Sequence, residues 1–366
     1  TLYIMIMHKL LLVLCSLAIM TSCIREELPN AEADILTVSV AQNDLLNGAP
    51  IVDNDRITLN VKPGYDVKKL ALHFTLTPGA TISPASGTER DFTQPQTYLV
   101  TSEDGRWTKQ YTVSAMGGGI VTTYSFETID TLSDKRYTTF AEFEGQKVSF
   151  TWASGNAGFA LTGVPKQPSD YPTAQAEDGV KGKSLLLTTR STGFLGTMFG
   201  RPLAAGNLFL GTFNPSNAIA EPLKATHFGI PFYHKPLVIK GYYQYQPGTQ
   251  YYNAGKLAND GTIDQGDIYA VFYETSDTLK SLDGTNVLTH PSIVSMAKMR
   301  EMKATSGWTE FNLPFVMQPG REIDPLKLSA GYYKLAIVFT ASRGGALFSG
   351  AVGSTLKVDE VQLVHE

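Results

Sequence analysis

The residues whose chemistry stands out first are aromatic side chains next to turn-forming residues. Trp152 lies just before a Gly-Asn pair, and Tyr251 and Tyr252 lie in a glycine-containing segment after a strand-like run. Flat aromatic rings can pack against the C–H faces of sugar rings. One interpretation is therefore a sugar-binding platform of Trp152, Tyr251 and Tyr252. The alternative is that these rings fill the core of a β-fold, where aromatic residues are common.

Planar polar side chains could bind the hydroxyl groups of such a sugar. Asn156 is in the turn after Trp152, and Arg343 follows the apolar run 335–339. At the end of a central strand, a guanidinium group offers a fork of N–H donors to neighbouring hydroxyls. Asn156 and Arg343 are therefore candidate ligand-binding residues. For Arg343 the alternative is a buried structural ion pair.

Three further aromatic residues are better explained as core residues. Tyr243 and Tyr245 are two positions apart, so they share one face of a predicted strand that also contains Tyr242. Trp308 precedes an alternating apolar run. We therefore assign Tyr243, Tyr245 and Trp308 to the core.

Glycoside hydrolysis would need two carboxyl groups about 5–5.5 Å apart for retention or about 6.5–9.5 Å apart for inversion. The candidates are Asp264, Asp267 and Glu274. Asp267 and Glu274 are seven positions apart on one predicted strand, which separates them by about 23 Å. Asp267 could instead pair with Asp264, and Glu274 with a residue of another strand such as Glu310. Nothing in the sequence distinguishes these carboxylates from ordinary solvated acids, so catalysis is the secondary interpretation.

The N-terminal segment is predicted to be a targeting signal rather than part of the fold. Leu10–Met20 is apolar or small throughout and follows His8 and Lys9, and this run is too short to span a bilayer but suits a signal peptide. The run leads into Met20-Thr21-Ser22-Cys23, which resembles a bacterial lipobox. We expect residues 1–22 to be a lipoprotein signal, Cys23 to be acylated, and residues 23–34 to be a tether. A plain secretory signal is the alternative.

The composition narrows the range of partners. Only 17% of the 366 residues are charged, and the formal net charge is −4, whereas about 25% is usual. A chain without an excess of positive charge lacks the electrostatic attraction to phosphate on which nucleic-acid binding depends, so we expect no nucleic-acid partner. The two cysteines cannot form a disulfide framework, since Cys15 would leave with the signal.

The elements that would position these residues are strands. Apolar residues alternate in the runs 35–40, 57–61 and 70–76, and the Asp104-Gly105 pair between two further alternating runs predicts a hairpin. Turn signals recur about every ten residues, as in antiparallel sandwiches. We predict an immunoglobulin-like β-sandwich over residues 35–116, followed by a flexible boundary at Gly117-Gly118-Gly119.

The remainder of the chain also has β character. About ten predicted strands over residues 120–366, without alternating helices, favour a jelly-roll β-sandwich and hence an all-β protein. One predicted strand is Gly158–Leu161, while Ile293–Met302 fits a helix or a strand equally well. Thr162–Lys183 and Gln246–Gln265 are predicted as long, functional loops.

Several segments of the C-terminal part carry a family resemblance. They are Trp152-Ala153-Ser154-Gly155-Asn156-Ala157-Gly158-Phe159, residues 241–248, residues 266–274 and residues 350–359. These segments resemble the "putative carbohydrate metabolism domain" lipoproteins of Bacteroides-type bacteria, and residues 79–87 resemble the Ig-like module in front of such domains. The resemblance implies a jelly roll like those of galactose-binding domains and carbohydrate-binding modules, with a glycan or oligosaccharide as partner.

The same resemblance implies a metal site, because carbohydrate-binding jelly rolls often join their terminal strands through a structural Ca²⁺. Glu127 follows the first predicted strand of this domain, and Asp359 lies in the last. Ca²⁺ takes six to eight oxygen ligands. Glu127 and Asp359 are therefore the calcium candidates, with plain surface acids as the alternative. A zinc site is not expected, since the spacing of His227 and His234 fits no zinc motif.

Three functions remain open at this stage. The first is a non-catalytic carbohydrate-binding protein of the cell envelope, which is lipid-anchored in the outer membrane and exposed at the cell surface. The second is a glycoside hydrolase that uses carboxylates around Asp267, and the third is a structural or adhesion protein. The sugar, the side of the membrane and the oligomeric state stay open.

Overall fold

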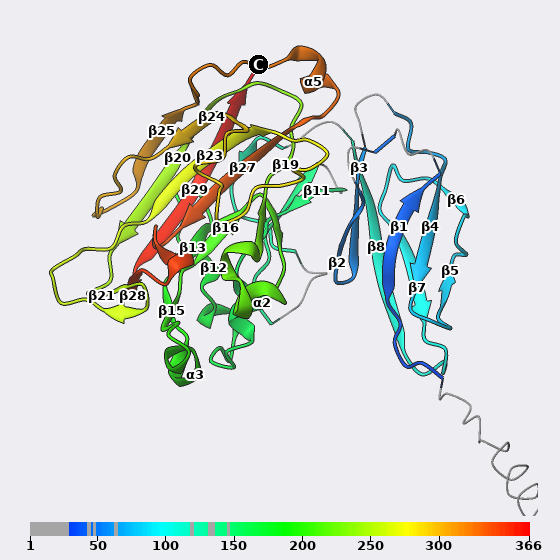
Figure 1. Cartoon of the computed structure of the whole chain (residues 1–366), viewed down its shortest axis with the longest axis horizontal. Helices are drawn as coiled ribbons and strands as arrows, with labels where there is room; N and C mark the ends of the chain where they lie inside the picture. The colour runs from blue at the N-terminus through cyan, green and yellow to red at the C-terminus, as the bar shows by residue number, and fades with distance from the viewer. Residues whose placement is uncertain are drawn as a thin grey trace, which may run out of the picture.

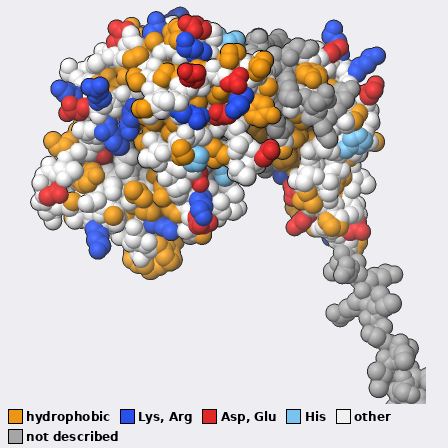
Figure 2. Space-filling view, turned by 45° about the horizontal axis from the view of Figure 1, so that its top comes forward, with side chains coloured by type: hydrophobic (Ala, Val, Ile, Leu, Met, Phe, Trp, Pro, Cys, Tyr) orange, Lys and Arg blue, Asp and Glu red, His pale blue; other side chains and the backbone are white. Residues whose placement is uncertain are grey.

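The computed structural model describes residues 29–41, 45–46, 49–61, 65–117, 121–130, 136–144 and 147–366. Their strands form two β-sandwiches, which confirms the predicted all-β class (Figure 1). Within these described ranges, no helix is long and apolar enough to cross a membrane. The predicted signal and Cys23 lie outside the described residues. Charged side chains of both signs are interspersed over one face of the molecule (Figure 2).

The N-terminal sandwich packs a three-stranded sheet against a five-stranded sheet. Strand β3 runs parallel to β8, and the other pairs are antiparallel. The predicted hairpin is β7 and β8, joined through Asp104 and Gly105. Alternation places Ile57, Leu59 and Val61 in the core. In sheet order, the strands are β1 (Ile35–Val40), β4 (Leu70–Leu76) and β6 (Glu89–Arg90), then β2 (Ile51–Asp53), β3 (Arg56–Val61), β8 (Thr108–Gly117), β7 (Gln96–Thr101) and β5 (Thr81–Ser83).

The C-terminal sandwich has two main antiparallel sheets. The first has the order β12 (Thr173–Ala176), β13 (Ser184–Thr188), β29 (Thr355–His365), β20 (Pro236–Gln246) and β25 (Thr309–Pro314), and β9 (Thr123–Tyr124) also pairs with β29. The second has the order β16 (Asn207–Phe209), β27 (Tyr333–Thr340), β23 (Asp267–Glu274), β24 (Ile293–Lys298) and β26 (Val316–Met317), and β19 (Ile230–Pro231) pairs with β27.

The two sheets differ in how their faces are covered. Strand β23 is buried at all but its last residue, because one face meets the main core and the other meets a second cluster that includes Phe228, Leu282 and Val287. Strand β20 instead alternates between buried and partly exposed residues. The centre of the second sheet at β23 is therefore covered on both faces, whereas β20 in the first sheet has one open face.

Shorter elements connect and cap the sheets. The strands among them are β10 (Ala141–Glu144), β11 (Lys147–Thr151), β14 (Arg190–Ser191), β15 (Leu203–Ala204), β17 (Gly211–Phe213), β18 (Thr226–Phe228), β21 (Gln250–Asn253), β22 (Lys256–Leu257) and β28 (Gly350–Val352). The helical turns are α2 (Asn156–Ala160), α3 (Gly193–Met198), α4 (Asn217–Ala220), α5 (Pro325–Ser329), η1 (Pro168–Asp170), η2 (Pro222–Lys224) and η3 (Gly345–Leu347).

Three local predictions need revision. The predicted strand at 158–161 is wrong, since the short helix α2 covers most of it and buries Phe159 beside the Tyr171 ring. The ambiguous segment 293–302 begins with strand β24. The two predicted loops are partly ordered: the first contains η1 and β12, and the second contains β21 and β22.

Candidate functional site

Trp152 and Asn156 are structural residues. The Trp152 side chain is 2% exposed and lies among the rings of Tyr124, Phe150 and Phe339. Asn156 is fully buried and bridges the chain by donating to the carbonyl of Thr173 (2.8 Å) and accepting from its N–H (3.1 Å). The prediction that these two side chains contact a sugar is therefore wrong.

The indole of Trp152 is hydrogen-bonded to a partly buried carboxyl group. Its Nε1–H donates to Glu142 Oε1 at 3.0 Å. Burial raises the pKa of Glu142 to about 7, although the bond from Trp152 offsets part of this effect. Glu142 therefore changes its charge near neutral pH within an aromatic core.

This carboxyl group makes stability depend on pH. Between its ordinary pKa of 4.5 and about 7, the folded chain holds a proton that the unfolded chain has released, so stability falls as pH rises through this range. Glu142→Gln cannot ionise. We expect it to raise the unfolding free energy by about 3 kcal/mol at about pH 8 and to have little effect near pH 4.5. Urea unfolding at both pH values measures this, and an equal effect at both would contradict it.

Tyr251 and Tyr252 do not form one platform. They are consecutive residues of strand β21, which pairs with β28, so their side chains point to opposite faces of this small sheet. Both are half-buried. The pKa of Tyr251 is raised by burial and by the negative charge of Asp264 nearby. Only Tyr251 therefore faces the polar residues described next.

Asp264 is the central anchor of this region. Its side chain is 3% exposed, and Oδ2 accepts bonds from the Ser342 hydroxyl (2.6 Å), the Ser354 hydroxyl (2.6 Å) and the Ala351 N–H (2.7 Å). Oδ1 accepts from the N–H of Gln265 at 2.8 Å. Because both oxygens are engaged, Asp264 joins the segment before β23 to the segments after β27, and a catalytic role for it has no support.

Asp267 and Arg343 form an ion pair next to this anchor. Arg343 Nε lies 3.1 Å from Asp267 Oδ2, and Lys298 Nζ lies 3.7 Å from the same oxygen. The Asp267 side chain is 2% exposed, while that of Arg343 is 36% exposed. Burial raises the pKa of Asp267, and the two cations counteract part of the rise. The ion pair that the sequence left as the alternative for Arg343 is therefore present.

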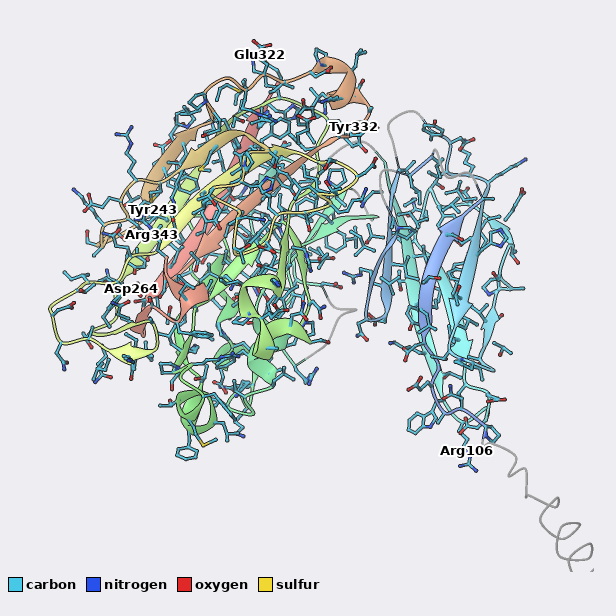
Figure 3. The ribbon with its side chains drawn as sticks, in the orientation of Figure 1. Arg106, Tyr243, Asp264, Glu322, Tyr332 and Arg343 are labelled. Carbon is cyan, nitrogen blue, oxygen red and sulfur yellow. The ribbon has the colours of Figure 1, made fainter. Side chains whose placement is uncertain are left out.

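We name this region the Arg343 corner and define it as Tyr251, Asp264, Asp267, Lys298 and Arg343. Figure 3 shows Asp264 and Arg343 at the same end of the C-terminal sandwich. Tyr243 is a core residue, as predicted, and is 7% exposed. The corner therefore combines a partly exposed aromatic ring, a fixed guanidinium group and an ammonium group.

Most N–H donors of the Arg343 guanidinium group are not engaged by the residues that the structure describes. Apart from the bond to Asp267, Nη2 donates to the backbone oxygen of Arg300 at 3.3 Å. A guanidinium group has five N–H bonds, so the other three have no partner among the residues that the structure describes. A polar ligand with neighbouring hydroxyls could accept from them.

The other carboxylates lie elsewhere. Glu274, at the far end of β23, binds Arg321 (3.1 Å) and Lys327 (2.5 Å). Glu310 is exposed on β25 of the opposite sheet. The structure therefore does not bring Glu274 together with Asp267 or Glu310 as a hydrolytic pair.

The two calcium candidates reach one turn. Glu127 Oε1 accepts from the N–H of Lys183 (3.0 Å), while Asp359 Oδ2 accepts from those of Val180 (2.7 Å) and Lys181 (3.2 Å). Backbone N–H groups thus already contact both carboxylates. No group of three or more His, Cys, Asp or Glu side chains that could hold a metal occurs among the described residues.

Sequence reasoning missed Lys298 and Glu142. Lys298 lies in the segment whose type was ambiguous, and its distance from Asp267 follows from the pairing of β23 with β24. Glu142 is an ordinary acidic residue in the sequence. Only the fold shows that it is partly buried and bonded to the indole of Trp152.

Comparisons with known proteins match the two sandwiches separately. A family model described as "Putative carbohydrate metabolism domain" matches residues 125–364, and one described as "SGBP, N-terminal" matches residues 35–115. A comparison with curated proteins gave no match.

Two solved structures from Bacteroides are similar over much of the chain. One, from Bacteroides thetaiotaomicron, is 52% identical with a TM-score of 0.88 and covers 93% of this chain and 99% of its own. The other, from Bacteroides vulgatus, is 40% identical with a TM-score of 0.64 and covers 68% of this chain and 100% of its own. Each is described as a "putative glycoside hydrolase".

Proposed function

Because the chain belongs to the family described as "Putative carbohydrate metabolism domain", we propose that it binds a glycan at the Arg343 corner. In this proposal the C-terminal sandwich binds the sugar, and the N-terminal sandwich holds it away from its attachment point. Binding, rather than hydrolysis, is the activity that the geometry favours.

The observation that carries the proposal is the state of Arg343. Asp267 fixes its Nε, yet three N–H bonds keep no partner among the described residues, and the side chain is 36% exposed. A guanidinium group fixed in this way can donate to neighbouring hydroxyls with little further loss of entropy. The ring of Tyr251 offers an apolar surface at the same corner. A neutral glycan presents both hydroxyl groups for the guanidinium donors and C–H faces for the aromatic ring.

A glycan array with the chain from Ile24 onward tests the proposal, followed by assays for reducing-sugar release from each bound glycan. Binding without release supports it. Release that Asp267→Asn abolishes would instead support a hydrolase, which is the description given to the two Bacteroides structures. The absence of any glycan signal would contradict both and favour a structural or adhesion role.

We also propose that the chain is a lipid-anchored protein of the cell envelope. Support comes from the apolar run and the lipobox-like Met20-Thr21-Ser22-Cys23. Metabolic labelling with a palmitate analogue should label the wild type but not Cys23→Ser.

A structural calcium ion at Glu127 and Asp359 is a further proposal. The two carboxylates belong to the first and last segments of the sandwich and reach the same turn, and Phe126 and Glu360 beside them have positive φ angles of 54° and 48°. Oxygen donors of this type suit Ca²⁺. We expect CaCl₂ to raise the melting temperature of the wild type relative to EDTA, and to raise that of Asp359→Asn less. Identical melting in CaCl₂ and EDTA would contradict the proposal.

A further inference from the structure

Helix α3 and the residue after it carry four large apolar side chains that point into solvent. Their exposed fractions are 80% for Phe194, 53% for Leu195, 58% for Met198 and 70% for Phe199. No residue of α3 is buried. We call these four residues the apolar tip. Hydrophobic side chains gather at the lower end of the C-terminal sandwich in Figure 2, where Figure 1 places α3. Grouped exposure of this kind marks an interaction site.

The backbone holds the tip rigidly. Strands β14 and β15 pair on either side of it, and the N–H of Thr192 donates to Pro202 O at 3.1 Å. The N–H of Arg201 donates to Gly196 O at 2.8 Å. A Cβ on Gly196 would lie 2.1 Å from Thr192 Oγ1, so only glycine allows this closure. The side chains are therefore displayed by a fixed hairpin rather than by a segment that could fold them inward.

The charge pattern around the tip fits a lipid surface. The segment from Ser191 to Gly200 has no charged residue, and an arginine lies directly at each end, Arg190 and Arg201. Apolar side chains beside cations are typical of segments that bind a bilayer interface, where the apolar groups enter the acyl region and the cations contact phosphates.

The size of the tip argues against a second protein as occupant. Four partly exposed side chains offer a few hundred Å² at most, whereas a stable interface buries about 800 Å² on each partner. Insertion into lipid needs no complementary surface. The bilayer is therefore the occupant that this small, protruding surface fits best.

The position of the tip agrees with a membrane-facing role. Asn30, near the start of the described chain, is bonded to the loop of Glu103 and Asp104, and Figure 3 shows Arg106 of this loop at the lower end of the N-terminal sandwich. Helix α3 lies at the same end of the C-terminal sandwich (Figure 1). The seven Cα–Cα steps from Cys23 to Asn30 span at most about 25 Å. The proposed acyl anchor would therefore bring this end close to the bilayer.

We propose that the apolar tip inserts into the surface of a lipid bilayer, with Arg190 and Arg201 at the level of the headgroup phosphates. The tip would give the chain a second membrane contact besides the anchor at Cys23. This contact would fix the orientation of the C-terminal sandwich relative to the bilayer.

Vesicle co-sedimentation tests this with the chain from Ile24 onward, which has every described residue but no acyl chain. We expect the protein to bind vesicles of mixed phosphatidylcholine and phosphatidylglycerol more strongly than phosphatidylcholine alone. The affinity of the double variant Phe194→Ser, Phe199→Ser for these vesicles should be lower by about tenfold or more. Leu326→Ser is the matched control, because Leu326 is 79% exposed on α5 at the opposite end, and it should bind as the wild type does.

Three results would overturn the proposal. The first is a wild type that binds neither kind of vesicle. The second is a double variant that binds vesicles as well as the wild type does. The third is concentration-dependent dimerisation in sedimentation velocity that the double variant loses while vesicle binding is absent, which would identify a second copy as the occupant. Glycan binding by the double variant should be unchanged, so failure here is distinguishable from failure of the glycan proposal.

Discussion

Replacement of Asp264 by alanine is expected to lower the unfolding free energy of the C-terminal sandwich by about 3–5 kcal/mol. The change removes the acceptor of four hydrogen bonds at a site that is 3% exposed. The hydroxyls of Ser342 and Ser354 and the N–H of Ala351 would then be buried without this acceptor. Urea unfolding followed by circular dichroism measures the loss.

Asp260 provides the matched control for this prediction. It lies four residues earlier in the same loop and is exposed, and among the described residues its side chain bonds only to Thr262. Asp260→Ala should therefore cost less than about 1 kcal/mol. A loss below about 1 kcal/mol for Asp264→Ala as well would contradict the role of Asp264 as the anchor of the Arg343 corner.

Trp152→Ala should have an effect of similar size, about 3–5 kcal/mol. The indole lies 5.2–5.9 Å, between ring centroids, from the rings of Tyr124, Phe150 and Phe339, and its removal leaves a cavity that this aromatic cluster cannot close. It also removes the only hydrogen bond that Glu142 accepts among those described. Thermal unfolding monitored by near-ultraviolet circular dichroism reports the loss.

Trp107→Ala is the control for Trp152→Ala, because Trp107 is 64% exposed and its loss should cost less than about 1 kcal/mol. The glycan affinity of Trp152→Ala, measured below its melting temperature, should equal that of the wild type. A large loss of glycan affinity in a folded Trp152→Ala variant would instead support a sugar-binding platform that includes Trp152.

The fold could be predicted because a strand that is buried on one face shows a two-residue alternation of apolar and polar residues in the sequence. Residues such as Ile57, Leu59 and Val61 alternate in the sequence and lie in the core. The strand predicted at residues 158–161 failed because four residues are too few to show a period. There, the buried Asn156 and the packing of Phe159 on Tyr171 favour a helical turn.

The candidate site could be predicted only in part. The position of Arg343 after an apolar strand pointed to a sheet end, and the structure places it there. Its partner Asp267 is 76 residues earlier, so their contact depends on the pairing of β23 with β27. Trp152 failed as a site residue because a residue next to a turn can point to either side of a strand. The opposed directions of Tyr251 and Tyr252 follow from strand β21, which the sequence suggested to be a loop.

The most direct test of the account is calorimetric titration of Arg343→Lys with a glycan found on the array. Lysine keeps a positive charge beside Asp267 but loses the fork of donors, so we expect affinity to fall about tenfold or more while the melting temperature stays close to that of the wild type. Tyr251→Ala should also weaken binding, whereas Tyr252→Ala, on the opposite face, should not. Unchanged affinity in both Arg343→Lys and Tyr251→Ala would contradict glycan binding at the Arg343 corner.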